Sequence, residues 1–139
     1  MTTHAEATFK VEGWDEQPWD TAEGQPKMTR SEVTKSFEGD LAGSSHLQYL
    51  MTYRADGTAD FVAMERIQGT LGGKRGTFVL RHVGAFVDGA ASGTWSVVDG
   101  SGTDDLKGLT GSSEFSIPKG EEAFPFVLDY DIREAAGVS

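Results

Sequence analysis

The fold is decided by residues 59–87, which read ADFVAMERIQGTLGGKRGTFVLRHVGAFV. Apolar and polar side chains alternate on both sides of Gly72-Gly73, and this two-residue period is typical of strands with one buried face. A Gly-Gly pair readily adopts the positive φ angles of a two-residue hairpin turn. We therefore predict an antiparallel hairpin with strands over Ala59–Leu71 and Arg75–Val87.

The same alternation continues on both sides of this hairpin. Asp56-Gly57 and Asp88-Gly89 mark two further reversals, and eighteen glycines spread through the chain suit short strands joined by tight turns. No apolar stripe of helical period and length is present. Residues 15–26, rich in Glu, Gln, Gly and Pro, are expected to form an exposed loop or flap. The other strands that we predict are Ala5–Trp14, Lys27–Glu38, His46–Arg54, Ala90–Asp99, Gly111–Ile117 and Ala123–Glu134.

Eight strands in hairpin succession predict an all-β fold, a single eight-stranded antiparallel β-barrel that is mostly a meander and lipocalin-like in appearance. Closure into a barrel removes both exposed edges of the sheet. A two-sheet sandwich would show the same periodicity and remains an alternative. The length of 139 residues is that of one domain, so we expect a single domain over 1–139 with its core at about 5–133.

Composition excludes several classes of function. Without cysteine there is no disulfide and no thiolate metal site. The N-terminus lacks the basic start and apolar run of a signal peptide, and no stretch has the length of a membrane span, so we expect a cytoplasmic protein that does not enter a membrane. A net charge of −10 would repel a polyphosphate backbone, which argues against nucleic acid as a partner.

The turns predict which side chains share the interior of the barrel. A two-residue turn at Gly72-Gly73 places Glu65 opposite Leu80 and Ala63 opposite His82, and a two-residue turn at Asp88-Gly89 places His82 opposite Trp95. At Asp56-Gly57 a three-residue turn with a bulge is preferred, because it adds Tyr49 and Tyr53 to the same largely apolar face. The interior would then be an apolar tube that carries a few polar groups: Lys35, Glu65, His82, Tyr49, Tyr53, Tyr130 and Trp95.

Two of these groups are candidate catalytic residues. A carboxylate in an apolar cavity has its charged form disfavoured, so Glu65 would hold its proton near neutral pH and act as general acid or base, with His82 as proton carrier. A plain ion pair of Glu65 with Lys35 or His82 is an equally weighted interpretation. Lys35 would be nucleophilic if desolvated, although a lysine that reaches the barrel mouth is the more common case. Lys35, Tyr49, Tyr53, Trp95 and Tyr130 are the candidate ligand-binding residues.

Motifs for cofactors are missing from the sequence. The three histidines, at 4, 46 and 82, have no metal-binding spacing, so no metal is expected. The run Gly100-Ser101-Gly102-Thr103 matches no phosphate-binding pattern, and no Gly-x-Ser-x-Gly motif supports a hydrolase. We therefore expect a protein that works without a cofactor.

The opposite face of the sheet is not cleanly polar, since Val62, Met64, Val79 and Val83 also lie there. Such a surface usually packs on another subunit, which predicts a homodimer. The alternative is that inside and outside are reversed, which would place Arg66 and Arg81 in the cavity.

Three segments resemble an uncharacterised bacterial family, a domain of unknown function, over about Ala5 to Arg133. They are VTKSFEGDLAGSS from Val33, ERIQGTLGGKRGTF from Glu65 and GTWSVVDGSGTDDLKGL from Gly93. That family is similar in fold to allene oxide cyclase, an eight-stranded barrel whose cavity holds a fatty-acid-derived epoxide. The resemblance implies an isomerase or cyclase at most, because the plant enzyme's cysteine has no counterpart here and fold alone does not carry activity.

Three functions follow as hypotheses. The first is a small-molecule barrel enzyme that isomerises or cyclises an apolar substrate while Glu65 and His82 move protons. The second is a non-catalytic carrier of a small apolar ligand in the same tube. The third is a structural dimer whose interior is filled by side chains.

Overall fold

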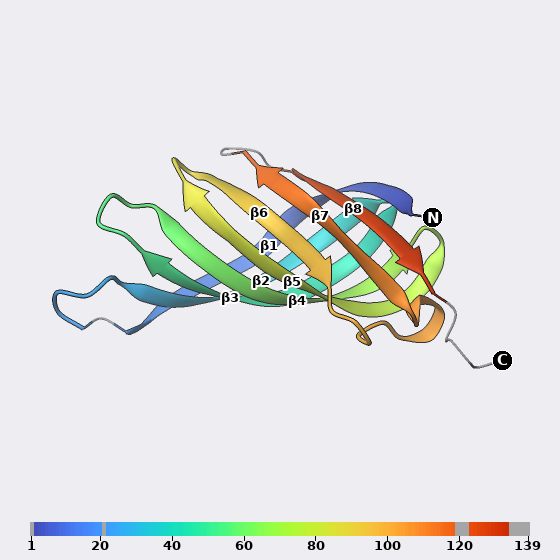
Figure 1. Ribbon diagram of the computed structural model, residues 1–139, viewed down its shortest axis with the longest axis horizontal. Helices are drawn as coiled ribbons and strands as arrows, with labels where there is room; N and C mark the ends of the chain where they lie inside the picture. Colours follow the sequence, from blue (N-terminus) through green and yellow to red (C-terminus); the bar gives the residue numbers. More distant parts are fainter. Residues whose placement is uncertain (1, 21, 119–122, 134–139) are drawn as a thin grey trace.

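The computed structural model describes residues 2–20, 22–118 and 123–133. Eight antiparallel strands close into one barrel in the order of the sequence, with β1 hydrogen-bonded to both β2 and β8 (Figure 1). This confirms the predicted eight-stranded meander and excludes the two-sheet sandwich. The strands are β1 (Thr3–Asp20), β2 (Met28–Gly39), β3 (Leu41–Tyr53), β4 (Ala59–Leu71), β5 (Lys74–Val87), β6 (Ala90–Val97), β7 (Leu109–Ile117) and β8 (Phe124–Ile132). A 3₁₀ turn, Asp104–Leu106, lies between β6 and β7.

The predicted register of the central hairpins is confirmed. Glu65 pairs with Leu80 and Ala63 with His82 across Gly72-Gly73, whose φ angles of 58° and 84° are those of a two-residue hairpin turn. His82 pairs with Trp95 across the next turn. The three-residue turn before β4 is also correct, because Tyr53 pairs with Ala59 and Tyr49 with Ala63.

The inside and the outside of the barrel are as predicted. The inward side chains form the core, among them Val33, Ile67, Leu80 and Leu128, each fully buried. Arg66 and Arg81 are exposed on the outer face, so the reversed arrangement is wrong. The reason is the alternation of strand side chains: once one residue faces inward, every second residue of that strand faces inward and those between face outward.

Two boundaries differ from the sequence prediction by more than two residues. Residues 15–20 do not belong to a loop but continue β1, which pairs with β2 as far as Asp20. A register shift between Val11 and Gly13 interrupts the alternation there, and this bulge disguises the second half of the strand. Pro18 is tolerated because β1 pairs with β8 only over Thr3–Phe9, which leaves the rest of β1 as an edge strand.

The second boundary lies in β3, which begins at Leu41 and not at His46. The segment 41–45 holds Ala, Gly and Ser side chains that show no apolar alternation, yet it pairs with both β2 and β4. The last predicted strand extends to Glu134, which lies outside the described residues, and β8 ends at Ile132.

The two ends of the barrel differ. At one end, Leu71, Leu109 and Tyr130 are buried together with Leu106 of the 3₁₀ turn. At the other end, the second half of β1 pairs with β2 alone, and the β1–β2 hairpin, which we call the arm, projects at the left of Figure 1. One end is therefore closed by packed side chains, and the arm lies at the other.

The backbones of the paired strands β3 and β4 approach closely at one glycine pair, which limits substitution there. Gly43 faces Gly69, and a Cβ atom added at Gly69 would lie 2.0 Å from the Ala42 carbonyl oxygen, at a φ angle of 152° that other residues rarely adopt.

We predict that Gly69→Ala lowers the free energy of unfolding by roughly 3 kcal/mol, since both overpacking and backbone strain oppose the native state. Urea denaturation followed by tryptophan fluorescence measures the change. Gly24→Ala is the control: Gly24 also has a positive φ but no atom within 4 Å of an added Cβ, so its loss is expected to stay near ~1 kcal/mol. Equal losses of unfolding free energy at both positions would contradict the argument from close backbone approach.

Candidate functional site

Four adjacent strands bring four polar side chains together in the barrel interior. The Glu65 carboxylate on β4 lies 2.7 Å from His82 Nε2 on β5 and 2.6 Å from Ser45 Oγ on β3. The Lys35 Nζ atom on β2 lies 3.5 Å from the same carboxylate. All four side chains are buried, so the sequence prediction that Lys35, Glu65 and His82 share the interior is confirmed.

The charge state of Glu65 differs from the expectation of a carboxyl that keeps its proton. Burial by itself would raise the pKa of Glu65, but the Lys35 ammonium and the hydrogen bonds from His82 and Ser45 lower the pKa to about 2. The carboxylate is therefore ionised at neutral pH. Glu65 is an ion-pair partner and holds no proton that it could donate. The ion-pair interpretation of the sequence describes the geometry.

The neighbours of Glu65 take complementary states. Burial lowers the pKa of His82 below its ordinary value against the opposing effect of Glu65, so the imidazole is neutral. Because an ionised carboxylate can only accept hydrogen bonds, His82 carries its proton on Nε2, and this N–H donates a hydrogen bond to Glu65. Burial on its own would lower the pKa of Lys35, but Glu65 holds it above the ordinary value, so Lys35 is an ammonium.

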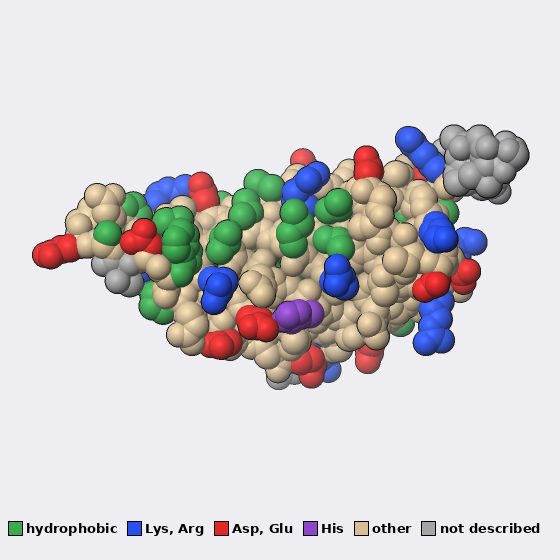
Figure 2. Space-filling view, turned by 90° about the horizontal axis from the view of Figure 1, so that it is seen from below, with side chains coloured by type: hydrophobic (Ala, Val, Ile, Leu, Met, Phe, Trp, Pro, Cys, Tyr) green, Lys and Arg blue, Asp and Glu red, His purple; other side chains and the backbone are tan. Residues whose placement is uncertain are grey.

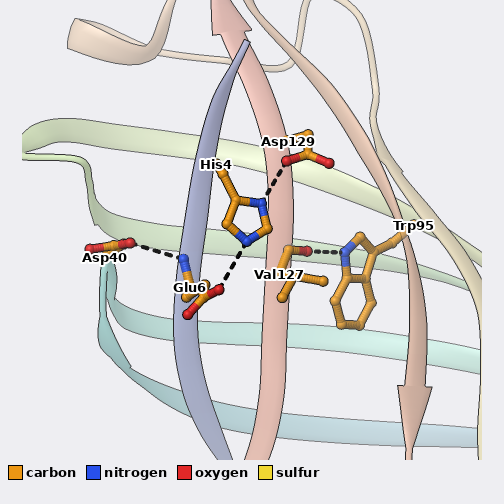
Figure 3. A network of polar contacts seen from close by, with 6 residues as sticks. All are labelled: His4, Glu6, Asp40, Trp95, Val127 and Asp129. Atoms are coloured by element: carbon orange, nitrogen blue, oxygen red, sulfur yellow. Dashed lines mark hydrogen bonds and ion pairs between the residues drawn. The ribbon is translucent and has the colours of Figure 1, made fainter.

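Aromatic rings enclose the imidazole. The His82 ring meets Tyr49, Trp95 and Phe115 edge to face, with ring centroids 5.5–6.0 Å apart. Trp95 stacks between Phe115 and Phe126. Its indole N–H donates to the Val127 carbonyl oxygen at 2.8 Å, as Figure 3 shows. These contacts lock His82 in one orientation and exclude water from the ion pair.

A cavity of about 220 Å³ opens beside the arm and reaches this cluster. Its walls are apolar and come from both ends of the chain, including Phe9, Val11 and Trp14 of β1 and Phe124 of β8. Lys35 and Tyr49 are its polar lining residues, and the Lys35 ammonium also lies 4.2 Å from the centre of the Phe9 ring. Glu65 and His82 do not line the cavity: they stand behind Lys35 and Tyr49.

The predicted ligand-binding residues therefore divide into two groups. Lys35 and Tyr49 line the cavity. Trp95 is buried in the aromatic core, Tyr130 lies at the closed end beside Gly72, and Tyr53 lies under the arm, so none of these three lines the cavity.

The arm contributes a second polar cluster that the sequence prediction does not contain. Glu16 accepts hydrogen bonds from Tyr53 Oη at 2.6 Å and Thr29 Oγ1 at 2.7 Å. Burial and the Glu16 carboxylate raise the pKa of Tyr53 to about 12. The sequence predicts a loop at Glu16 because the bulge hides its strand, and it omits Ser45 because the predicted strand begins one residue later.

A further histidine-centred contact lies on the surface. His4 bonds Asp129 at 2.6 Å and Glu6 at 3.1 Å, and these hydrogen bonds raise its pKa (Figure 3). It joins β1 to β8 where the barrel closes. In the part of the chain that the structure describes, no group of three or more His, Cys, Asp or Glu side chains is arranged to hold a metal ion.

Comparison with known protein families gives a match for this chain. A family model described as "Protein of unknown function (DUF3224)" matches residues 5–130. The chain belongs to the DUF3224 family. The resemblance stated from its sequence segments is thereby confirmed at the level of the family, whereas the likeness to allene oxide cyclase stays a prediction.

A solved relative has the same barrel. The DUF3224 chain is similar to the crystal structure of a protein with unknown function from the same family, from Shewanella oneidensis MR-1, with a TM-score of 0.77 and 27% sequence identity. The alignment covers 97% of this chain and all of that one. No curated protein matches. Within the described residues, no helix has the length and hydropathy to cross a membrane.

The buried ion pair predicts how stability depends on pH. Glu65 has a folded pKa of about 2 against an ordinary value of 4.5, so it stabilises the fold above pH 4.5 and loses this effect as the pH falls towards 2. The contribution is about 3 kcal/mol by linkage. His82 adds to the loss below pH 6.5, because only the unfolded chain takes up that proton readily.

We expect urea denaturation at a series of pH values to show a steep loss of stability between pH 4.5 and 2 in the wild type. The double variant Lys35→Met/Glu65→Gln removes both charges together, which avoids leaving one of them buried and unpaired. Its stability should fall much less over the same interval. Parallel curves for the two proteins would show that Glu65 is not the group that titrates.

Proposed function

We propose that this DUF3224 protein binds a small, largely apolar molecule that carries one hydrogen-bond acceptor oxygen. The observation that supports the proposal is the cavity beside the arm: apolar walls enclose two polar groups, and these are the Lys35 ammonium and the Tyr49 phenol. Ligand sites commonly combine apolar walls with a few placed donors. The volume of about 220 Å³ is below that of drug-sized sites, which favours a small ligand.

The electrostatics favour a neutral ligand. Lys35 and Glu65 already balance each other, and the neutral His82 adds no charge, so a buried ligand charge would be uncompensated. A carbonyl, ether or epoxide oxygen instead accepts from Lys35 without changing the charge of the interior. Lys35 retains donor capacity for it, because an ammonium has three N–H groups and its carboxylate contact is 3.5 Å long.

A second candidate function is isomerisation or cyclisation of the same molecule. It is favoured by the chain of groups behind the cavity, in which Glu65 fixes the Lys35 ammonium and is itself held by His82 and Ser45. A preorganised ammonium and phenol would stabilise negative charge that develops on the ligand oxygen. The groups that would touch the ligand are then Lys35 and Tyr49, with Glu65 and His82 as positioning residues.

Filling the cavity should abolish binding. Ala91 lines the wall on β6, and we predict that Ala91→Trp removes the saturable chemical-shift changes that a medium-chain methyl ketone causes in amide NMR spectra of the wild type. Ala55→Trp, on the exposed β3–β4 turn, is the matched control and should bind as the wild type does. Wild-type protein that shows no saturable change, or an Ala91→Trp variant that binds normally, would refute this site.

The role of Lys35 is tested by comparing two probes. For the double variant Lys35→Met/Glu65→Gln we predict at least about tenfold weaker ketone binding, since a charge-assisted hydrogen bond contributes roughly 1.5–3 kcal/mol. Binding of an alkane of equal length should be unchanged, which controls for the shape of the cavity. Equal losses for both probes would mean that Lys35 acts only through packing.

Glu65→Gln separates the two candidate functions once a ligand of the cavity has been identified. Retained affinity with lost turnover supports the enzyme, whereas weakened binding in the absence of any turnover supports the carrier.

A further inference from the structure

The outer face of β2–β5 carries an exposed apolar patch. Leu50, Val62, Met64 and Val83 are each about half exposed and lie side by side on three strands. Figure 2 looks onto this side of the molecule, where hydrophobic side chains gather beside Lys and Arg side chains. Together with flanking arginines they line a hollow of about 640 Å³. A patch of this kind usually marks an interaction surface.

The strand register arranges this face in three parallel rows that run across the strands from β2 to β5. The first row is Arg30, Leu50, Val62 and Val83. The middle row is Glu32, Gln48, Met64 and Arg81. The third row is Thr34, His46, Arg66 and Val79.

The middle row has opposite charges at its two ends. Glu32 stands on β2 and Arg81 on β5, with two intervening strands at about 4.8 Å spacing between them. Glu32 bonds only the half-exposed His46, at 3.0 Å, and among the described residues no carboxylate lies within ion-pair distance of Arg81. Each end of the row is therefore available to an opposite charge on a partner.

We propose that this face binds the same face of a second copy of the chain, about a two-fold axis parallel to the strands and between β3 and β4. Such an axis exchanges β2 with β5 and β3 with β4 while it keeps each row opposite itself. Leu50 then meets Val62 of the second copy, twice, on either side of the axis in the first row, and Gln48 meets Met64 in the middle row. Glu32 of each copy meets Arg81 of the other, so the apolar contact is flanked by two ion pairs.

The other two-fold axis in the plane of contact, perpendicular to the strands, produces mismatches. It keeps β2 opposite β2 and exchanges the first row with the third, so Glu32 meets Glu32 and Arg81 meets Arg81. It also places the apolar Val62 against Arg66. The first axis likewise places Arg30 against Val83, so a charge on an apolar residue does not distinguish the two axes. Like charges in direct opposition are unfavourable, and the charged middle row is therefore complementary only about the first axis.

Charge also favours this face over the others for contact between copies. Two chains of net charge −10 repel each other, and this repulsion is weaker across a face that carries few carboxylates. Arg30, Arg66 and Arg81 lie together on this face with Glu32 as the nearby acid of its rows. The contact is limited to four strands, which is typical of a dimer that dissociates on dilution.

Sedimentation velocity over a concentration series tests the proposal. We expect a reversible monomer–dimer equilibrium in the wild type, and a dimer dissociation constant at least about tenfold higher for either Glu32→Arg or Arg81→Glu, because each creates two like-charge contacts. An equimolar mixture of the two variants should dimerise like the wild type. In that mixed dimer the two substituted side chains form an ion pair of reversed polarity at one end, and the native pair remains at the other.

Glu23→Arg, on the β1–β2 connection, makes the same charge change as Glu32→Arg and should leave the monomer–dimer equilibrium unchanged. Circular dichroism confirms that each variant is folded. A wild type that stays monomeric at all concentrations, a dimer that neither single variant weakens, or a mixture that fails to recover dimerisation would each overturn the proposal. None of these outcomes bears on ligand binding, because the cavity opens inside the barrel and beside the arm.

Discussion

Closure of the barrel places the Glu65 carboxylate where water cannot hydrate it, and the structure around it follows from that constraint. An unpaired buried charge is costly, so the carboxylate requires the Lys35 ammonium and donors from His82 and Ser45. These groups come from four adjacent strands, and they satisfy one another only in a single register. The buried charges are therefore balanced only when the four strands from β2 to β5 pair in this register.

The asymmetry of β1 turns this closed interior into a candidate site. Over Thr3–Phe9 the strand is held by β8, and beyond Phe9 it continues only with β2. The bulge after Val11 then brings Trp14 over Tyr49, with ring centroids 5.6 Å apart. One strand therefore seals the barrel with its first half and forms the wall of the cavity with its second.

Interior and exterior use polar groups in opposite ways. Inside, charges are balanced and fixed, which suits recognition of a neutral ligand by the donors Lys35 and Tyr49. Outside, the charges at the two ends of the row from Glu32 to Arg81 lie apart on the same sheet, which suits recognition of another surface. Because alternate residues of β4 and β5 face the two sides, the same strands carry both arrangements.

The sequence by itself determined the order of the eight strands, most of their length, their turns and the inward face, because alternation and turn residues are local signals with a fixed geometry. Gly72-Gly73 sets the register that joins Glu65 to His82 and places Arg66 on the outside, and Asp88-Gly89 sets the register that pairs His82 with Trp95. Only the tertiary structure decided the charge of Glu65, since its pKa depends on Lys35 from a strand 30 residues away in the sequence. It also decided where the cavity lies, because a bulge in β1 breaks the alternation on which a local prediction depends, and cavity walls from β1, β6 and β8 meet only when the barrel closes.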